Sequence, residues 1–321
     1  MNAAMIEQAG ATPVYGQLAD ARAAEGCRLI QVRAAALSHV TKSRASGKHY
    51  SAAGGQNFVP GIDGTGILED GRRVYFLLPE SPHGSMAELS VVDPAHCIEL
   101  PDKLSDIAAA AIAIPGMSSW VALKERARFA AGGTVLVNGA TGTSGGLAVQ
   151  VAKRLGARRV IATGRNAEAL ARLASLGADL TISLNQEAGA LDKALKASFR
   201  NGVDVVLDYL WGPSAEAILV AAAQAAPEAV PIRYIQIGSA SGPDITLPSP
   251  VLRSSSIELL GSGINSVPLP RIKDAIRDLF ASAAAGEFEV PVQAVALQRA
   301  GEFWDRPDGH PRIVFTMDRQ V

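Results

Sequence analysis

Three glycines follow an apolar run in the middle of the chain, at a spacing that suits a phosphate group. Residues 135–146 read V-L-V-N-G-A-T-G-T-S-G-G. A strand, a turn without bulky side chains and the start of a helix, in this order, let backbone N–H groups and the helix dipole bind a pyrophosphate. The alternative is a glycine-rich loop that binds no ligand. The residues predicted to bind a dinucleotide are Gly139, Thr141, Gly142, Thr143, Ser144 and Gly145.

The end of the next predicted strand indicates which dinucleotide is bound. Sites for NAD carry an acidic residue about 20 positions beyond the glycine turn, which binds the ribose 2′-hydroxyl. Here residues 162–166 read A-T-G-R-N, without a carboxylate. Arg165, after Gly164, offers a fork of donors that matches a phosphate. The sequence therefore favours NADP, although Arg165 could also be an ordinary solvated surface residue.

The surrounding pattern predicts a parallel sheet that positions these residues. From about Ser105, short apolar runs alternate with Ala- and Leu-rich helical patterns, which is typical of βαβ units. One helix is expected to end at Leu176-Gly177, where glycine suits the C′ position. The predicted strands cover residues 134–138, 159–163, 180–183, 203–207, 232–237 and 256–261.

The first 100 residues show a different pattern of apolar and turn-forming residues. Apolar runs at 28–32, 71–77 and 87–92 are separated by Gly, Pro and Ser, which predicts an antiparallel or barrel-like domain. After about residue 266, a helix at 271–284 and a strand at 312–315 are expected to return to this domain. A chain of 321 residues also exceeds the size at which one hydrophobic core usually keeps growing, so two domains are expected.

Composition limits the partners and the compartment. The net charge of -1 gives no reason to expect nucleic acid or an anionic membrane as a partner. Two cysteines, Cys27 and Cys97, form no disulfide framework, so a cytoplasmic location is expected. The N-terminus lacks a basic region before an apolar core, unlike a signal peptide. The most apolar stretch, 108–114, stops at Pro115 and Gly116 and is too short to span a membrane.

Together, these motifs resemble the quinone oxidoreductase branch of the medium-chain dehydrogenase/reductase superfamily over nearly the whole chain. The likeness rests on F-V-P-G-I-D-G-T-G (58–66), I-P-G-M-S-S-W-V-A-L (114–123), the glycine turn and D-V-V-L-D (204–208). The resemblance implies an α/β fold, in which a doubly wound Rossmann sheet (115–265) is inserted into a β-rich, GroES-like substrate domain (1–114 plus 266–321). It also implies further residues near the cofactor, namely Ser118, Gly238, Ser239, Gly263 and Asn265.

The resemblance does not extend to the metal site of the zinc enzymes in this superfamily. Those enzymes place a His-Glu pair in the P-G element, where this sequence has Ile62 and Asp63. Zinc needs three or four N, S or O ligands. Two cysteines cannot build the four-cysteine structural lobe of those enzymes, and the histidines show no paired ligand spacing. We therefore expect no metal. The five histidines are His39, His49, His83, His96 and His310.

The branch's substrate motif, Asn-x-x-Asp followed by Gly-x-Tyr, is altered here. Ser38 and Thr41 stand at its first two positions, and Tyr50 follows Gly47 with one extra residue. By the resemblance, Ser38 and Tyr50 are the catalytic candidates. Phenols ionise near pH 10, so Tyr50 would donate a hydrogen bond or proton to a developing oxyanion. The alternative for Tyr50 is a buried structural tyrosine.

Without a Lewis acid, the expected reaction is hydride transfer to a quinone or an α,β-unsaturated carbonyl compound, whose charged product modest donors can stabilise. Two alternatives stay open. One is enoyl-thioester reduction, for which Lys42, Arg44 and Lys48 would form a basic entrance; the other is a non-catalytic, NADPH-binding structural or regulatory protein. Tyr209 and Trp211 either wall the substrate cleft or serve packing. The resemblance further implies a homodimer through the apolar edge strand at 256–261.

Overall fold

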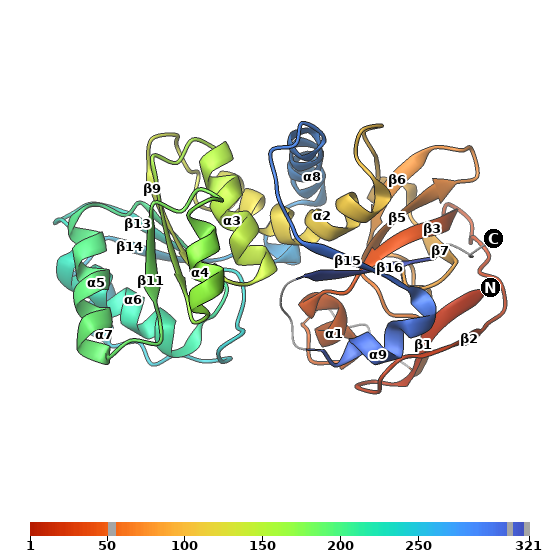
Figure 1. The fold of residues 1–321 in the computed structure, drawn as a ribbon, viewed down its shortest axis with the longest axis horizontal. Coiled ribbons are helices and arrows are strands. Elements are labelled where there is room, and N and C mark those ends of the chain that lie inside the picture. Colours follow the sequence, from red (N-terminus) through yellow and green to blue (C-terminus); the bar gives the residue numbers. More distant parts are fainter. Residues whose placement is uncertain (51–55, 307–310, 318–321) are drawn as a thin grey trace. The chain divides into compact units, whose positions relative to one another are not determined.

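The chain forms two units, each with its own internal contacts (Figure 1). This computed structural model describes residues 1–50, 56–306 and 311–317. The first unit is Met1–Ile114, Phe280–Gly286 and the chain from Val290 onward, and the second is Pro115–Leu279 with Glu287–Glu289.

The second unit contains a six-stranded sheet in the order β11-β10-β9-β12-β13-β14. All neighbouring strands run parallel. The order reverses between β9 and β12, so this is the doubly wound Rossmann sheet that the sequence predicted. The strands are β9 (Thr134–Asn138), β10 (Arg159–Gly164), β11 (Leu180–Ser183), β12 (Val205–Asp208), β13 (Ile232–Gln236) and β14 (Ile257–Gly261).

Helices cover both faces of this sheet, with α3 and α4 on one face and α5, α6 and α7 on the other (Figure 1). On the second face, Leu136 and Val206 of the strands share a buried cluster with Phe199 and Leu219 of the helices. Because both faces are covered, the strands are almost continuously apolar. The helices are α3 (Thr143–Arg154), α4 (Ala167–Leu173), α5 (Ala188–Arg200), α6 (Gly212–Ala225) and α7 (Ser249–Arg253).

Helix α4 ends at Leu173, a few residues before the predicted end at Leu176, and Gly177 closes the turn that follows it. Beyond Leu173 the chain closes in a Schellman motif, in which Ala178 N–H donates to the Leu173 carbonyl (2.9 Å) and Gly177 N–H to the Ala174 carbonyl (3.2 Å). Gly177 has φ +108°, a left-handed conformation that favours glycine.

Helix α2 (Asp106–Val121) differs from the expectation, because it continues through Pro115 and Gly116 where the apolar stretch was expected to stop. With the π-helical turn η2 (Ala122–Arg126), it is long and apolar enough to cross a membrane by length and composition alone. However, 72% of its apolar window is buried inside the protein. We therefore interpret it as a core helix.

Gly116 also shows how α2 packs within the second unit. A Cβ atom at this position would come within 2.7 Å of Leu279 Cδ1, so the side chain of Leu279 in α8 (Leu269–Ala284) packs directly over Gly116. The second unit thus continues to Leu279, beyond residue 266 where the sequence analysis expected the return to the first unit.

The first unit is β-rich, with two sheets. A three-stranded antiparallel sheet has the order β2-β1-β4, and a seven-stranded sheet has the order β15-β16-β3-β5-β6-β8 with β7 paired to β3. The pairs in the larger sheet are antiparallel except β15 with β16. The strands are β1 (Asn2–Gln8), β2 (Val14–Gln17), β3 (Arg28–Ala36), β4 (Gln56–Phe58), β5 (Asp63–Leu68), β6 (Arg73–Leu77), β7 (Leu89–Val92), β8 (Cys97–Glu99), β15 (Val292–Ala296) and β16 (Arg312–Thr316).

Short helices complete the first unit. A core cluster joins Ile6 of β1, Ala35 of β3, Phe303 of α9 and Phe315 of β16, so sequence-distant segments share one apolar interior. The helices are α1 (His39–Ala45) and α9 (Ala300–Trp304), with 3₁₀ turns η1 (Pro94–His96) and η4 (Leu297–Arg299); η3 (Ile264–Ser266) belongs to the second unit.

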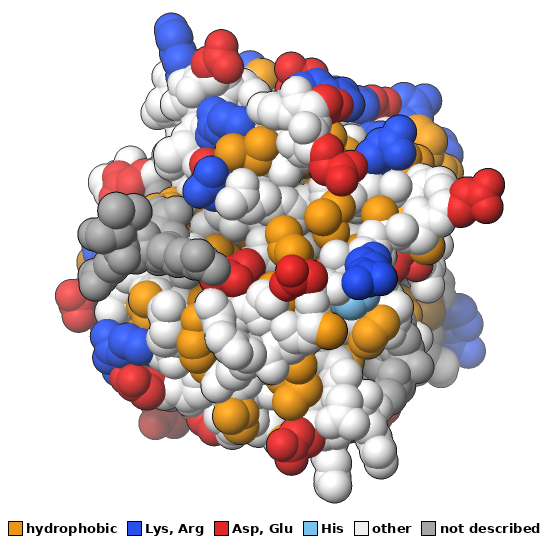
Figure 2. Space-filling view, turned by 90° about the vertical axis from the view of Figure 1, so that its right-hand side faces the viewer, with side chains coloured by type: hydrophobic (Ala, Val, Ile, Leu, Met, Phe, Trp, Pro, Cys, Tyr) orange, Lys and Arg blue, Asp and Glu red, His pale blue; other side chains and the backbone are white. Residues whose placement is uncertain are grey.

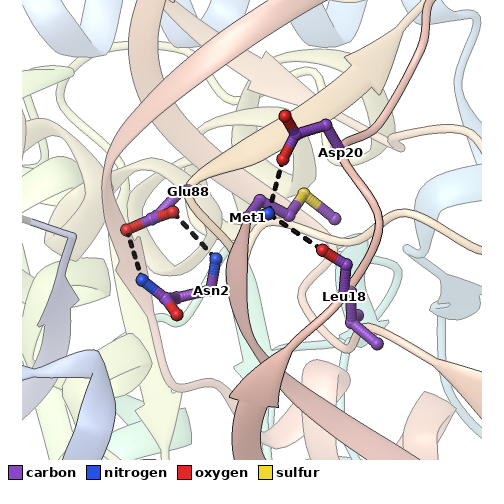
Figure 3. A network of polar contacts seen from close by, with 5 residues as sticks. All are labelled: Met1, Asn2, Leu18, Asp20 and Glu88. Atoms are coloured by element: carbon purple, nitrogen blue, oxygen red, sulfur yellow. Dashed lines mark hydrogen bonds and ion pairs between the residues drawn. The ribbon is translucent and has the colours of Figure 1, made fainter.

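Polar contacts fix the first strand at its start (Figure 3). The ammonium group of Met1 donates to the Leu18 carbonyl (2.9 Å) and to Asp20 Oδ1 (2.5 Å). The Asn2 backbone and side-chain amides both donate to the Glu88 carboxylate, at 2.8 and 2.9 Å. These bonds attach β1 to the segment after β2 and to the segment before β7.

The face of the molecule in Figure 2 carries acidic and basic side chains close together, between small apolar spots. No extended patch of one sign covers the described residues of this face. Such a mixed surface agrees with the net charge of -1 and gives no footprint of the kind that binds a nucleic acid backbone.

Candidate functional site

The turn between β9 and α3 has the backbone geometry of an anion site. Gly139 has φ +88°, and its N–H and that of Ala140 donate to the Thr163 carbonyl at 3.2 and 2.8 Å. The first hydrogen bond of α3 runs from Gly146 N–H to the Gly142 carbonyl (2.8 Å), and no side chain caps the helix. The N–H groups of residues 143–145 therefore precede the helical ladder and can donate to a bound anion.

The glycines of the turn have different steric roles. A Cβ atom at Gly145 would come within 2.2 Å of the Gly139 carbonyl oxygen and 2.6 Å of Ala140 Cα, so this glycine lets the helix pack on the turn. A Cβ atom at Gly142 would have the Gly139 oxygen, at 3.9 Å, as its nearest neighbour. Gly142 therefore leaves open space beside the N–H groups.

The end of β10 contacts this turn. A Cβ atom at Gly164 would come within 2.3 Å of Thr141 Cγ2, so Gly164 is needed for the Thr141 side chain to lie against the strand. Arg165, the next residue, is exposed, and its carbonyl accepts a hydrogen bond from Asn185 Nδ2 (2.9 Å). Within the described ranges of the chain, its guanidinium makes no hydrogen bond or ion pair, so it is available to a phosphate.

Ser118 and Gly238 lie near the same sheet edge, and both contact Tyr209. Ser118 Oγ lies 2.7 Å from the Pro115 carbonyl oxygen and 3.2 Å from the Tyr209 hydroxyl. A Cβ atom at Gly238 would come within 2.8 Å of the Tyr209 carbonyl oxygen. Ser239 follows Gly238 beyond β13. Because the strands are parallel, the loops after β12 and β13 share the carboxyl edge of the sheet with the glycine turn. Ser118, in α2, contacts the first of these loops through Tyr209.

Gly263 and Asn265 lie farther along this edge, after the last strand. Gly263 precedes the 3₁₀ turn that contains Asn265, and its N–H donates to Ser266 Oγ (2.9 Å). The chain is held to the neighbouring strand by the bond from Ser262 N–H to the Gln236 carbonyl (2.8 Å). Among the described residues, no hydrogen bond joins Gly263 or Asn265 to the glycine turn itself.

A buried polar network beside the turn was missed by sequence reasoning. Asn138 Nδ2 donates to Asp208 Oδ1 (2.7 Å), Thr163 Oγ1 donates to Asn138 Oδ1 (2.7 Å), and the Tyr234 hydroxyl donates to Asp208 Oδ2 (2.8 Å). Burial raises the pKa of Asp208, and these hydrogen bonds oppose the rise. The network joins β10, β9, β12 and β13. The signal in the sequence was a polar residue at or near the end of three of the apolar runs, at Asn138, Thr163 and Asp208.

In the first unit, Ser38 is the N-cap residue of α1. Its side chain is 3% exposed and caps α1: Ser38 Oγ accepts from Thr41 N–H at 3.0 Å and lies 2.8 Å from Thr41 Oγ1. Loss of such a cap typically costs about 1 kcal/mol of stability. The structure thus gives this catalytic candidate a structural role at a helix N-terminus.

Tyr50 lies at the surface, whereas a tyrosine that packs in the core would be buried. It is 65% exposed, and its ring centroid lies 4.2 Å from that of His49, with the planes tilted by 31°. Burial lowers the pKa of His49, and the charges of Arg44 and His39 lower it further. The alternative of a buried tyrosine is therefore wrong. The His49 contact was not foreseen.

Comparisons with known proteins agree on one family. A family model described as "Zinc-binding dehydrogenase" matches residues 145–280. The Emericella nidulans protein named "Probable NADPH-dependent quinone reductase tdiC" is 29% identical over 87% of the chain and 88% of its own length. Prostaglandin reductase-3 of Bos taurus is 29% identical over 76% of the chain and 63% of its own length, so the chain spans less than two thirds of it.

The fold of one solved structure matches this chain over nearly its full length. The quinone oxidoreductase of Thermus thermophilus, which was also solved with NADPH, is 26% identical, with a TM-score of 0.77 over 99% of this chain and 100% of that one. These comparisons support the medium-chain dehydrogenase/reductase superfamily for this chain, and within it the quinone oxidoreductase-like branch that the motifs predicted.

The residues that the structure describes do not form a site for the zinc ion of some superfamily members. Ile62, 4% exposed, stands where those enzymes have histidine. Burial raises the pKa of the next residue, Asp63, to about 7, opposed by the charge of Arg312 and by the Tyr75 hydroxyl at 3.2 Å. In the described part of the chain, no group of three His, Cys, Asp or Glu side chains could hold a metal ion. His310 lies outside the described residues.

Proposed function

We propose that this protein is an NADPH-dependent oxidoreductase that reduces a quinone or an α,β-unsaturated carbonyl compound. The observation that carries the proposal is the uncapped start of α3 behind an open Gly142, with Arg165 at the end of the adjacent strand. In this arrangement the turn binds the pyrophosphate and Arg165 binds the 2′-phosphate. The bound cofactor supplies a hydride.

Substitution of Arg165 by alanine should remove most of the preference for NADPH over NADH. A charge-assisted hydrogen bond contributes roughly 1.5–3 kcal/mol, so the wild type should bind NADPH about 10- to 100-fold more tightly than NADH. Titration of both cofactors against both proteins measures this directly. Equal affinity of the wild type for the two cofactors would refute the assignment, and Arg172→Ala, in α4, is a matched control.

The substrate class follows from what the chain's own side chains can stabilise. Hydride addition to a quinone or a conjugated carbonyl leaves a phenolate or enolate, which a neutral hydroxyl can stabilise by hydrogen bonding. We assign this donation to Tyr50, whose phenol is the hydrogen-bond donor that the motif comparison predicts and whose side chain is 65% exposed. The names of the Emericella and Bos taurus relatives, a quinone reductase and a prostaglandin reductase, support this class.

A substrate panel tests the proposed function. NADPH oxidation should be measured with quinones, enones and a crotonyl thioester. Turnover of quinones or enones supports the proposal, whereas turnover of the thioester alone would favour enoyl-thioester reduction. NADPH binding without turnover of any member would indicate a structural or regulatory role and would contradict the proposal.

We also propose that catalysis needs no zinc, since the residue at the superfamily's histidine position is Ile62. Exhaustive chelation should leave activity and melting temperature unchanged, because no ligand set is lost. Elemental analysis of protein purified without added metal is the second measurement. Stoichiometric zinc, or loss of activity that added zinc restores, would contradict this prediction.

A homodimer through β14 is a further part of the proposal. This strand ends the sheet, and Leu259 on it and Leu252 in α7 are 37% and 45% exposed. An apolar edge strand with unpaired N–H and C=O groups favours pairing with a second copy. Light scattering at micromolar concentration should give a dimer mass, and a monomer would contradict it. Neither Cys27 nor Cys97 forms a disulfide, which suits the cytoplasmic location that we propose.

A further inference from the structure

Thr141, in the turn between β9 and α3, lies against the end of β10. The N–H groups of Gly139 and Ala140 both donate to the Thr163 carbonyl, at 3.2 and 2.8 Å, so the start of the turn is attached to this strand. The next residue of each segment is also in contact. A Cβ atom at Gly164 would come within 2.3 Å of Thr141 Cγ2, 2.9 Å of its Oγ1 and 3.2 Å of its Cβ. Thr141 therefore fills the space that a side chain at residue 164 would need.

Rotation of the Thr141 side chain does not open this space. The Cβ atom of threonine holds its two γ heavy atoms and one hydrogen in staggered positions. The positions that Cγ2 and Oγ1 occupy lie 2.3 and 2.9 Å from the Cβ site at residue 164, and both distances are too short for a real contact. Two heavy atoms cannot leave both of these positions empty when only one other position exists. Every staggered rotamer therefore places a methyl or hydroxyl group too close to a side chain at residue 164.

The strand itself is held on both sides. Gly164 is buried, it is paired with Ser183 of β11, and its carbonyl accepts from Leu184 N–H at 2.8 Å. On the other side of β10, Thr163 is paired with Asn138 of β9. A shift of β10 would break hydrogen bonds to both neighbouring strands. An overlap with a side chain at residue 164 must therefore be relieved in the turn.

The contact lies where the two dinucleotide cofactors differ. The adenosine ribose is joined to the pyrophosphate through its 5′ carbon, so a pyrophosphate on the glycine turn keeps the ribose 2′ group within one sugar ring of the turn. NAD sites of this fold bind the 2′-hydroxyl with an acidic residue about 20 positions beyond the turn, and Gly164 is 19 positions beyond Gly145. The place that such an acid would take is thus next to Thr141.

We propose that Thr141 is a specificity-determining residue, whose two γ atoms exclude an acidic side chain from residue 164 and thereby exclude the contact that selects NAD. The inference rests on the proposed function, since it needs a dinucleotide on the turn. The preference for NADP then has two sources. Arg165 attracts the 2′-phosphate, and Thr141 keeps the competing acid out.

The first measurement is the melting temperature of the protein without cofactor. Gly164→Ala should lower it by about 2–10 °C, the effect that overpacking by a methyl group typically has on a unit of this size. In a Thr141→Ser background this loss should largely disappear, because serine has a single γ atom, which can rotate to the clear position. Thr141→Val is the matched control. It has two γ atoms and no hydroxyl, so Gly164→Ala should cost as much there as in the wild type.

The second measurement is the Kd of NADH and of NADPH. Gly164→Asp alone should weaken the binding of both, because the overlap displaces the turn. Combined with Thr141→Ser, it should bind NADH at least about tenfold more tightly than Gly164→Asp alone, as expected for a charge-assisted hydrogen bond. This double variant should also prefer NADH, because the carboxylate accepts from a 2′-hydroxyl and repels a 2′-phosphate. Thr141→Val with Gly164→Asp should behave like Gly164→Asp alone.

The inference is overturned if Gly164→Ala costs no stability, or costs as much in the Thr141→Ser background as in the wild type. It is overturned as well if Gly164→Asp alone prefers NADH, or if Thr141→Ser with Gly164→Asp still prefers NADPH. Failure of the proposed function is a separate result. The wild type would then bind neither cofactor or reduce no member of the panel, whereas the melting temperatures, which need no cofactor, would still follow the pattern above.

Discussion

Substitution of Gly142 by alanine should lower the affinity for NADPH about 100-fold while the protein stays folded. Without cofactor, the new methyl group meets no atom closer than 3.9 Å, and φ of −86° suits alanine. With cofactor, it occupies the space that the second glycine of such turns leaves for the pyrophosphate. Loss of one or two charge-assisted hydrogen bonds accounts for this factor. Fluorescence titration of NADPH, with a melting curve of each variant, measures both effects.

Gly189, in α5, provides the control for this substitution. A Cβ atom there would meet nothing within 4 Å, so Gly189→Ala should leave NADPH affinity unchanged and raise stability by up to about 1 kcal/mol. Loss of glycine at the N-cap in Gly142→Ala should cost no more than about 1 kcal/mol. If Gly142→Ala binds NADPH like the wild type, the cofactor does not lie on this turn.

Substitution of Tyr50 by phenylalanine should lower kcat 100- to 1000-fold. Removal of a single donor to a developing oxyanion typically costs about 2.7–4 kcal/mol of transition-state stabilisation. Tyr50 is 65% exposed, so neither Tyr50→Phe nor Tyr50→Ala should lower the melting temperature appreciably. Steady-state kinetics on the best substrate, with NADPH affinity measured separately, distinguish a lost donor from a damaged fold.

His49 supplies a check on this second prediction. Its ring contacts that of Tyr50, but its lowered pKa keeps it neutral at pH 7. His49→Gln should therefore reduce kcat much less than Tyr50→Phe does. Full activity of Tyr50→Phe would mean that water or the cofactor ribose is the donor, and the assignment of Tyr50 would then be wrong.

Local patterns in the sequence were sufficient to predict the strands of the parallel sheet and the glycine turn before α3. The apolar runs that became the central strands β9, β10 and β12 are buried on both faces, so each run stands out without knowledge of its neighbours. The same holds for Gly177, whose left-handed φ closes the turn after α4, and for the glycine spacing before α3. Pro115 was misinterpreted because proline usually ends or kinks a helix, whereas α2 continues through it.

Contacts between distant residues could not be predicted in this way. Asn138 and Asp208 are 70 positions apart, and Ser118 and Tyr209 are 91 apart, so only the sheet order brings them together. Ser38 shows that a local signal can also be overlooked. Its hydroxyl caps α1, for which serine before a helix is such a signal, and the chemical role that the family motif implies stays a prediction.

The most direct test of the account is to follow the transferred hydrogen with NADPH deuterated at C4 of the nicotinamide. With an enone substrate and exhaustively chelated protein, the deuterium should appear on the β-carbon of a saturated ketone. That result means conjugate addition without a metal, with the enolate protonated at the neighbouring carbon. Deuterium on the carbonyl carbon of an allylic alcohol, formed only when zinc is added, would contradict the account.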